Sequence, residues 1–557
     1  MKDTIPGEGG GRVNAFGDSK RLSMALMTAA WILFLSASFA ARYSVDVAHA
    51  AILGLAFVLA GVLCAAVWGN EREFALLAAF LVAVSLVRIF AILTSGVDLS
   101  GDEAHYWEWS RRLDWSYYSK PPGVAYVIRL GTLIFGNTVL GVRAFAAVFS
   151  FGAGLFMYAL GRRLYNAKVG AWAAGLMQVV PLFALYGVGM TPDTILIFFW
   201  TLALFLFKRA EEEGTPRAWL VLGVAMGLGL LGKLAILFFY IPAVIVLLLS
   251  EGGRRQLERP WPYVGFATSL VFLLPVAVWN SRHGWVNLKH EIAHANAAQG
   301  LSLSAASFGD FVGSQLAVVT PVVFVLMLYA LIRQRKEDAF SFWFSIPIMA
   351  GFALKSILGK VQANWALVAY MTGTVAFAAV FVGGFGRLGA KLRRLAVIGI
   401  AIAVAATAAG YYPRILGELG VPAKYDPSKR LVGWRELGRE VSRFNRSLEG
   451  PRFIFSDQYA IASELAFYVE GQPRTYCANL GRRMNQYDLW PGFESFIGYN
   501  AIYVTQGKAG RRLPEAFERM EEHAVVVRDG RGREVKRFKV FLCYGFKGME
   551  TGTITLH

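Results

Sequence analysis

Two adjacent carboxylates and a lysine that precedes a proline pair mark one short stretch of the chain as a place for chemistry. Asp102 and Glu103 come first, aromatic residues follow at close spacing, and a Lys-Pro-Pro-Gly run at 120–123 ends the stretch. The Pro-Pro step fixes an extended backbone, which would hold Lys120 at a set position. A carboxylate can take a proton from a hydroxyl group, and cations can stabilise a phosphate that leaves. The stretch therefore favours a group transfer from a phosphate-linked donor.

The same residues have plainer interpretations that the sequence leaves open. Asp102 and Glu103 would also suit the first turn of a helix, where acidic side chains are favourable. Aromatic rings suit the faces of a sugar, but they are equally typical of the belt at a membrane interface. The aromatic and imidazole side chains that we take as candidate substrate contacts are His105, Tyr106 and Tyr117.

The elements that position this stretch are apolar runs. Of the 557 residues, 56% are hydrophobic and 17% are charged, whereas a soluble domain carries about 25% charge. The runs are roughly 17 to 25 residues long, which is the length of helix that crosses a bilayer. They predict a polytopic α-helical membrane protein of roughly thirteen spans, at 24–42, 48–68, 73–95, 139–160, 169–189, 193–208, 217–231, 234–250, 261–280, 310–333, 339–357, 364–384 and 394–412.

The basic residues predict the orientation of these spans. Loops at 162–168, 208–217, 254–259, 333–336 and 391–394 are rich in Lys and Arg, so we place them and the N-terminus in the cytoplasm. The net charge of +18 then reflects topology and contacts with anionic membrane lipids, and no nucleic-acid partner is expected.

The alternation of the spans divides the chain into three parts. Residues 1–20 are Gly-rich and polar and are expected to be a disordered cytoplasmic tail, and residues 21–412 form the membrane domain. Loops 96–138 and 281–309 and the tail 413–557 lie outside. Residues 413–557 are predicted to be a small α/β extracytoplasmic domain, with helices at 434–448 and 460–469 and strands at 452–456, 501–505, 523–528 and 535–544.

The first outer loop resembles the signature loop of a known family. Its Asp-Glu-Ala-His-Tyr run at 102–106, the 120–123 run, Phe135-Gly136 and the Gly-Val-Arg run at 141–143 match in order and spacing the membrane-embedded (GT-C type) transferases. That family holds the lipid A 4-amino-4-deoxy-L-arabinose transferases and the protein O-mannosyltransferases. The Lys360 to Trp365 segment, Gly433-Trp434 and the 485–490 run are similar to its bacterial members.

The resemblance implies an enzyme of the inner membrane. It would transfer a sugar from a polyprenyl-phosphate donor to a lipid or glycan acceptor of the cell envelope, such as lipopolysaccharide. Asp102 would be the catalytic base or the acceptor-orienting group, Glu103 would support it, and Lys120 and Arg143 would contact the donor phosphate. Ser119 stands where one branch has an acidic residue that helps to hold a metal, so a divalent metal cofactor stays open.

Further basic residues lie at the predicted outer ends of spans. Lys233, Lys355 and Lys360 are candidate contacts of the donor phosphate, and Asn364 and Trp365 are candidate substrate contacts. Lys233 would otherwise be a lysine that snorkels from a helix end. Asp193 is either a helix cap or a cavity carboxylate.

Three rival functions and one bonding question stay open. The resemblance also allows a protein O-mannosyltransferase-like enzyme. A transporter or flippase of lipid-linked sugars would explain the spans and the cavity charges. The His-Glu-Ile-Ala-His run at 290–294 matches the zinc-protease pattern, although the third ligand is not evident. Cys477 and Cys543 either form a disulfide or stay free thiols, and Cys64 lies in an apolar run.

Overall fold

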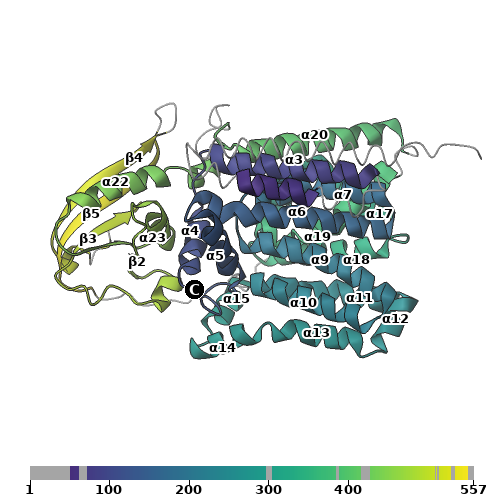
Figure 1. Cartoon of the computed structure of the whole chain (residues 1–557), viewed down its shortest axis with the longest axis horizontal. Helices are drawn as coiled ribbons and strands as arrows, with labels where there is room; N and C mark the ends of the chain where they lie inside the picture. The colour runs from purple at the N-terminus through teal and green to yellow at the C-terminus, as the bar shows by residue number, and fades with distance from the viewer. Residues whose placement is uncertain are drawn as a thin grey trace, which may run out of the picture.

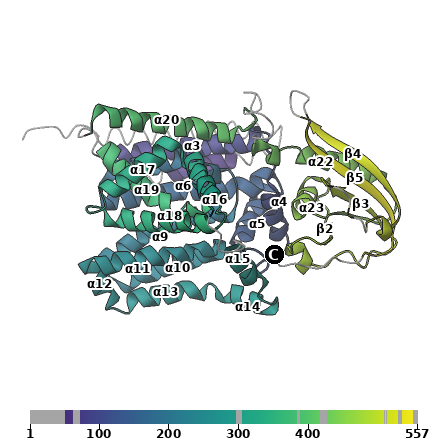
Figure 2. The same ribbon diagram turned by 180° about the vertical axis from the view of Figure 1, so that it is seen from behind.

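The computed structural model describes residues 51–61, 72–295, 304–383, 388–415, 427–507, 510, 513–528 and 534–549. A bundle of long helices forms one part of the molecule, and a sheet with two helices forms a smaller unit at one end of the bundle (Figures 1 and 2). Two short helices of the first outer loop, α4 (Gly101–Ser110) and α5 (Gly123–Phe135), lie between the two parts.

The apolar runs of the sequence form the helices of the bundle, and prolines start several of them. Pro192, Pro216 and Pro321 each stand in the first turn, where the missing N–H costs nothing. A helix covers Ala51–Gly61, and the others are α3 (Arg72–Thr94), α6 (Val139–Leu164), α7 (Ala167–Val179), α8 (Pro181–Ala184), α9 (Pro192–Glu213), α10 (Pro216–Gly232), α11 (Tyr240–Leu249), α12 (Glu251–Leu257), α13 (Trp261–Val271), α14 (Leu274–Arg282), α16 (Ala305–Val319), α17 (Pro321–Arg333), α18 (Ala339–Leu358), α19 (Ala369–Ala378) and α20 (Ala390–Tyr411).

The chain is a multi-pass membrane protein by the length and composition of these helices. Within the described residues, α3, α6, α18 and α20 are long and apolar enough to cross a membrane, and four bent helix pairs raise the number to as many as eight. On α20, Val397, Ile398 and Ile402 are exposed, as a lipid-facing surface requires. The total of roughly thirteen spans stays a prediction, and the run at 24–42 lies outside the described residues.

The first outer loop is an ordered structure with its own helices. Ser100 starts α4 with a capping box, in which its hydroxyl accepts a hydrogen bond from the backbone N–H of Glu103 and the Glu103 carboxylate accepts one from the backbone N–H of Ser100. The second outer loop carries α15 (Val286–Ala295). The cap therefore fixes where α4 begins and which way its first two acidic side chains point.

The C-terminal unit is a five-stranded mixed sheet with helices α22 (Trp434–Ser447) and α23 (Tyr459–Tyr468) packed on it. The strand order is β2-β1-β3-β5-β4, in which β1 pairs parallel with β2 and β3, and the other pairs are antiparallel. The strands are β1 (Arg452–Ser456), β2 (Thr475–Cys477), β3 (Asn500–Thr505), β4 (Phe517–Arg528) and β5 (Glu534–Phe546). Both predicted helices and all four predicted strands are present, whereas the three-residue β2 was not predicted.

The sheet also decides the bonding state of two cysteines. Cys477 and Cys543 are free and buried. Cys477 lies on β2 and Cys543 on β5, with β1 and β3 between them, so about 14 Å separates the two strands. A disulfide needs Cα atoms within about 7 Å, so the disulfide that the sequence left open is wrong for this fold. Cys64 lies outside the described residues.

Candidate active site

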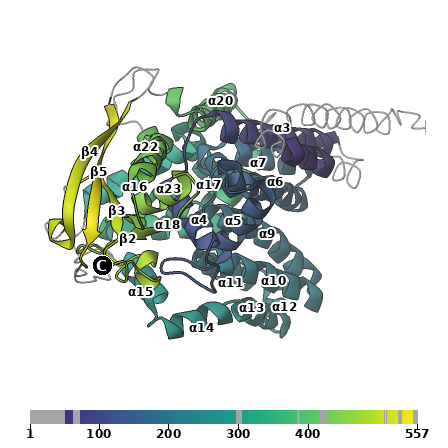
Figure 3. The ribbon, with the colours of Figure 1, turned by 60° about the vertical axis from the view of Figure 1, so that its left-hand side comes forward.

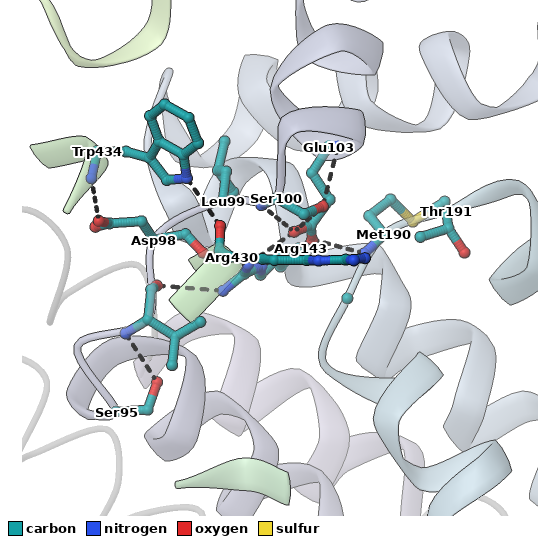
Figure 4. A network of polar contacts seen from close by, with 12 residues as sticks. Ser95, Asp98, Leu99, Ser100, Glu103, Arg143, Met190, Thr191, Arg430 and Trp434 are labelled. Carbon is teal, nitrogen blue, oxygen red and sulfur yellow. Dashed lines mark hydrogen bonds and ion pairs between the residues drawn. The ribbon is translucent and has the colours of Figure 1, made fainter. Parts of the chain in front are cut away.

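A buried ion pair joins the first outer loop to the bundle (Figure 4). Arg143 on α6 donates from Nε to Glu103 Oε1 at 2.8 Å and from Nη2 to Glu103 Oε2 at 2.7 Å. The same guanidinium donates to the backbone oxygen of Asp98 at 2.9 Å, and Glu103 also accepts from the backbone N–H of Met190 at 3.1 Å. The pair therefore ties the loop, α6 and the turn before α9 together.

Glu103 and Arg143 neutralise each other in this ion pair. Burial alone would raise the pKa of Glu103, but the charge and hydrogen bonds of Arg143 outweigh it and hold the pKa below its usual range. Glu103 and Arg143 are 3% and 5% exposed. The sequence predicts that Arg143 contacts a donor phosphate and that Glu103 supports the base. In the structure the two side chains bind each other and hold the loop in place, and both roles stay predictions.

Asp102 has a different environment from its neighbour. Its side chain is exposed, and the hydroxyl of Tyr459 on α23 donates a hydrogen bond to its Oδ1 at 2.9 Å. The carboxylate is thus oriented by the C-terminal unit and still open to solvent on its other side. It can accept a further proton donor, such as a hydroxyl group.

Tyr106 lies one turn after Asp102 on α4 and marks where several charged groups converge. Burial raises the pKa of its hydroxyl well above the usual value, and the nearby negative charges of Asp102, Asp193 and Glu291 raise it further. These three carboxylates come from the first outer loop, from the start of α9 and from the second outer loop. The negative charges of all three segments therefore act on the hydroxyl of Tyr106.

Two of the predicted lysines pair with carboxylates of this group. Lys233 Nζ lies 2.7 Å from Asp193 Oδ1, and Asn364 donates to Asp193 Oδ2 at 3.1 Å. Lys120 Nζ lies 2.5 Å from Glu291 Oε1. Each pair is partly open to solvent, so an incoming phosphate can compete for the lysine. Asp193 thus lies in the first turn of α9 and binds both Lys233 and Asn364.

A close backbone contact places the two lysines near each other. Gly123 packs against the end of α10, where a Cβ would lie 2.6 Å from the backbone oxygen of Leu231. Lys233 follows α10 directly, and Lys120 precedes Gly123 by three residues. Only glycine lets the turn that carries Lys120 approach the helix end that carries Lys233.

The remaining basic candidates lie at the end of α18 and just beyond it. Lys355 Nζ is 5.7 Å from the ring of Trp365, which belongs to the short helix η3 (Ala363–Ala366). Lys360 is exposed. Asn364 is the residue of this segment that directly contacts the carboxylate group described above.

His105 and Tyr117 lie in the interior of the first outer loop. The Nδ1 atom of His105 is 3.0 Å from Ser463 Oγ, and burial together with the positive charge of Arg482 lowers its pKa to about 3, so the imidazole is neutral. Tyr117 stacks on Trp109 with ring centroids 4.4 Å apart. Both side chains are buried, so they shape the loop and do not present an open surface to a substrate.

The structure gives no support to a zinc site. Among the residues it describes, no group of three or more His, Cys, Asp or Glu side chains is placed to hold a metal ion. His290 is buried and packs on the ring of Tyr118 at 4.7 Å between centroids. The side chain of His294 lies outside the described residues, so the metal question stays open.

The C-terminal unit supplies site residues that sequence reasoning missed. Tyr459 and Ser463 on α23 contact the first outer loop, and Gln486 accepts a hydrogen bond from the backbone N–H of Tyr118 at 2.6 Å. Figure 3 shows α23 directly beside α4. The 485–490 run was the one sequence signal for this contact, because no local pattern marks Tyr459.

Comparison with known proteins confirms the resemblance of the loop. The profile of the dolichyl-phosphate-mannose-protein mannosyltransferase family matches residues 119–279. The lipid A galacturonosyltransferase RgtD of Rhizobium johnstonii is 32% identical over 304 residues, which are 52% of this chain and 62% of that protein. An undecaprenyl phosphate-alpha-4-amino-4-deoxy-L-arabinose arabinosyl transferase of Sodalis glossinidius is 31% identical over 36% of this chain and 40% of its own length.

A solved structure shares the fold. The crystal structure of ArnT from Cupriavidus metallidurans bound to undecaprenyl phosphate has a TM-score of 0.59 at 18% identity, and the match covers 83% of this chain and 97% of that one. The chain therefore has the GT-C fold of that structure. It spans about three fifths of the length of the galacturonosyltransferase and two fifths of that of the arabinosyl transferase.

Proposed function

We propose that this chain is a GT-C type glycosyltransferase of the plasma (inner) membrane that transfers a sugar from a polyprenyl-phosphate donor to a lipid or glycan of the cell envelope. Two similar proteins are named for sugar transfer to lipid A or from undecaprenyl phosphate, and a protein of the same fold binds undecaprenyl phosphate. These names support a lipid A-type acceptor over a protein acceptor. In this proposal, the N-terminus is cytoplasmic and the site faces the periplasm.

One observation carries the proposal. An exposed carboxylate, Asp102, and two lysines, Lys120 and Lys233, come from three segments of the chain that converge around Tyr106. A base for a hydroxyl group and cations for a phosphate are what this reaction requires in one place. If Asp102 were only a helix cap, no lysine would be needed near it. If Lys120 and Lys233 only reached from helix ends toward the membrane surface, no carboxylate would be needed near them.

The mechanism follows from these positions. Asp102, oriented by Tyr459, accepts the proton of the acceptor hydroxyl as its oxygen attacks the anomeric carbon of the donor sugar. The bond from that carbon to the phosphate oxygen breaks, and the phosphate leaves with the electron pair. Lys120 and Lys233 exchange their carboxylate partners for the phosphate and stabilise its charge. A direct attack of this kind inverts the anomeric configuration.

The other candidate residues take supporting roles in this proposal. Glu103 and Arg143 position Asp102 through the buried ion pair. Lys355 and Lys360, at the outer end of α18, attract the anionic donor toward the site. Asn364 holds Asp193 in place, and Trp365 is a candidate contact for the sugar or the lipid.

The test is sugar transfer by purified protein in detergent, with Asp102→Asn as the main variant. The substitution keeps the size of the side chain and removes the base, so we expect turnover to fall by about 10²–10⁴-fold with normal expression. Tyr459→Phe is the matched variant, because it keeps the base and removes only the hydrogen bond that orients it. We expect it to lose much less activity, and full turnover by Asp102→Asn would disprove the assigned role.

The same assay separates a transferase from a flippase of lipid-linked sugars. Detergent removes the compartments across which a flippase would act. Net formation of glycosylated acceptor therefore requires an enzyme. Absence of product with every envelope acceptor tested, together with donor movement across reconstituted vesicles, would favour the flippase.

A further inference from the structure

The C-terminal unit contains a pocket that the reaction described above does not use. Its volume is about 120 Å³, and it opens at the end of β2, where the segment 487–494 forms one wall. The lining combines five aromatic rings with polar and charged side chains, and the residues used in the argument are Arg112, Tyr476, Asn479, Trp490, Phe493 and Glu494.

An unpartnered amide in the lining favours a polar ligand. Asn479 is 4% exposed, and its Oδ1 accepts hydrogen bonds from the backbone N–H groups of Gly481 at 3.0 Å and Arg482 at 3.2 Å. Its Nδ2 atom has no hydrogen-bond partner. A buried donor without a partner is costly, so the pocket favours an occupant that offers an acceptor to this group.

The wall of the pocket is held rigidly before any ligand arrives. Asn485 caps the short helix η7 (Gln486–Leu489). Arg482 binds the Asp488 carboxylate with two hydrogen bonds, at 2.8 Å and 3.0 Å, and it also donates to the backbone oxygen of Cys477 at 2.9 Å. Arg112 of the first outer loop covers the ring of Trp490 at 4.1 Å. A wall fixed in this way loses little conformational entropy on binding.

The chemistry of the lining fits a sugar ring. The C–H faces of a pyranose pack on aromatic rings, and its hydroxyl groups can pair with both donors such as the Asn479 amide and acceptors such as the Glu494 carboxylate. An apolar ligand would leave Asn479 without a partner. A simple anion would meet the negative charge of Glu494. The pocket is partly open to solvent, so a pyranose ring can lie with one part inside it and the rest outside.

The pocket is connected to the proposed active site. Tyr487 lines the pocket, and its hydroxyl lies 3.0 Å from Ser463 Oγ, which in turn lies 3.0 Å from His105 Nδ1. The ring of His105 packs on Tyr459, with centroids 4.9 Å apart, and Tyr459 orients Asp102. A short row of buried contacts therefore joins the pocket to the carboxylate.

We propose that this pocket is a saccharide subsite that binds one pyranose ring of the acceptor, away from the hydroxyl group that reacts. Its role for the acceptor rests on the proposed function, whereas saccharide binding by the pocket does not. A subsite of this kind uses a remote part of the acceptor to hold the reacting part in place.

The test measures saccharide binding directly by saturation-transfer difference NMR. The full chain is placed in phospholipid nanodiscs, because many detergents carry sugar headgroups, and methyl glycosides of glucose, galactose, glucosamine and mannose are the probes. We expect saturation of the ring protons of at least one glycoside. The signal should fall to background in Asn479→Asp, which keeps the Oδ1 acceptor and removes the Nδ2 donor.

Two further variants keep the test decisive. Asn445→Asp is the matched control, because the Asn445 Oδ1 also accepts a hydrogen bond, from Arg452 Nε at 3.0 Å, and the residue does not line the pocket. It should leave the signal unchanged. Glu494→Gln changes an exposed wall residue without endangering the fold, and it should weaken the signal. No signal from any glycoside, or a signal that Asn479→Asp and Glu494→Gln both leave intact, would overturn the subsite.

Transfer kinetics then separate the subsite from the function. Asn479→Asp should raise the KM for a full-length acceptor at least several-fold while the KM for the donor stays unchanged. Glycoside binding without any sugar transfer would refute the function and leave the saccharide site standing. Normal transfer with an unchanged acceptor KM in Asn479→Asp would refute the acceptor role alone.

Discussion

Asp102 and Glu103 occupy successive positions of α4, and the rotation of about 100° between neighbouring helical residues sends their side chains in different directions. Glu103 turns inward to Arg143, whereas Asp102 stays exposed beside Tyr459. The buried charge of Glu103 is stabilised by its ion pair with Arg143. The outward residue stays available to a substrate. The buried Glu103 therefore fixes the loop, and the exposed Asp102 beside it is accessible to a substrate.

The buried ion pair predicts a loss of stability when the charge of Glu103 is removed. Glu103→Gln leaves the Arg143 guanidinium buried without a counter-charge, which costs about 3–5 kcal/mol. We expect a clearly lower midpoint in an unfolding titration with sodium dodecyl sulfate. Glu534→Gln, which removes one partner of the exposed Glu534–Arg537 pair, is the control and should not shift the midpoint. An unchanged midpoint for Glu103→Gln would contradict the anchoring role.

The residue types of the site could be predicted from the sequence, but their partners could not. The spacing of Asp102, the 120–123 run and Arg143 was sufficient to identify the loop. It could not reveal that Arg143 binds Glu103, because residues 40 positions apart meet only in the folded chain. Tyr459 was missed for the same reason, since it lies 357 positions after Asp102.

At the scale of elements, the contact between the 120–123 turn and α10 decides where Lys120 lies. Gly123→Ala would bring a Cβ to 2.6 Å from the backbone oxygen of Leu231, and neither backbone can yield easily. We expect the turn to shift and transfer activity to fall by about 10²-fold, as for a misplaced reacting group. Gly252→Ala, whose Cβ would meet nothing within 4 Å, is the control and should keep full activity. Equal activity of both variants would show that the turn is not constrained.

The junction between α23 and the first outer loop contains a buried carboxyl group without partners. Burial raises the pKa of Glu464 well above its usual value, and the negative charge of Asp98 raises it further. Both carboxyl oxygens lack a hydrogen-bond partner. The folded protein therefore holds a proton that the unfolded chain releases above about pH 4.3.

This proton predicts how stability depends on pH. Because the folded state binds more protons than the unfolded state, the contribution of Glu464 to stability falls as pH rises above about 4.3, by at most about 1.4 kcal/mol per pH unit. Glu464→Gln removes this pH-dependent contribution to stability. We expect thermal unfolding to show a gain in stability over the natural chain that is larger at pH 8 than at pH 5. A difference that stays constant with pH would mean that Glu464 does not hold the proton.

Elements were easier to predict than their arrangement. The apolar runs located the long helices of the bundle, and the turn residues located the main strands, because both signals are local. The helices α4, α5 and α15 lie in segments that the sequence predicted as loops. The bends between α7 and α8 and between α16 and α17 were not predicted, since a proline marks a break in a helix but does not give the angle of the bend. The strand β2 was not predicted because three residues are too few to show the alternating pattern of a strand.

At the scale of the whole molecule, the site lies where three parts meet: the helical bundle, the outer loops and the sheet unit. The sheet unit packs on α4, and α12 lies at the opposite end of the bundle (Figure 1). The basic segment 254–259, which includes the last residues of α12, lies at that opposite end. In the proposed orientation, the two ends of the bundle face different compartments and the site lies at the outer end.

Labelling of single cysteines tests this orientation. Glu470→Cys places a thiol on the exposed surface of the sheet unit, and Glu258→Cys places one in the basic loop after α12. An impermeant maleimide should label Glu470→Cys in intact spheroplasts and Glu258→Cys only after the membrane is opened. The natural chain sets the background, which the burial of Cys477 and Cys543 keeps low. Labelling in the reverse pattern would place the lysines and Asp102 on the cytoplasmic side, where the acceptor would have to be a lipid or glycan that has not yet crossed the membrane.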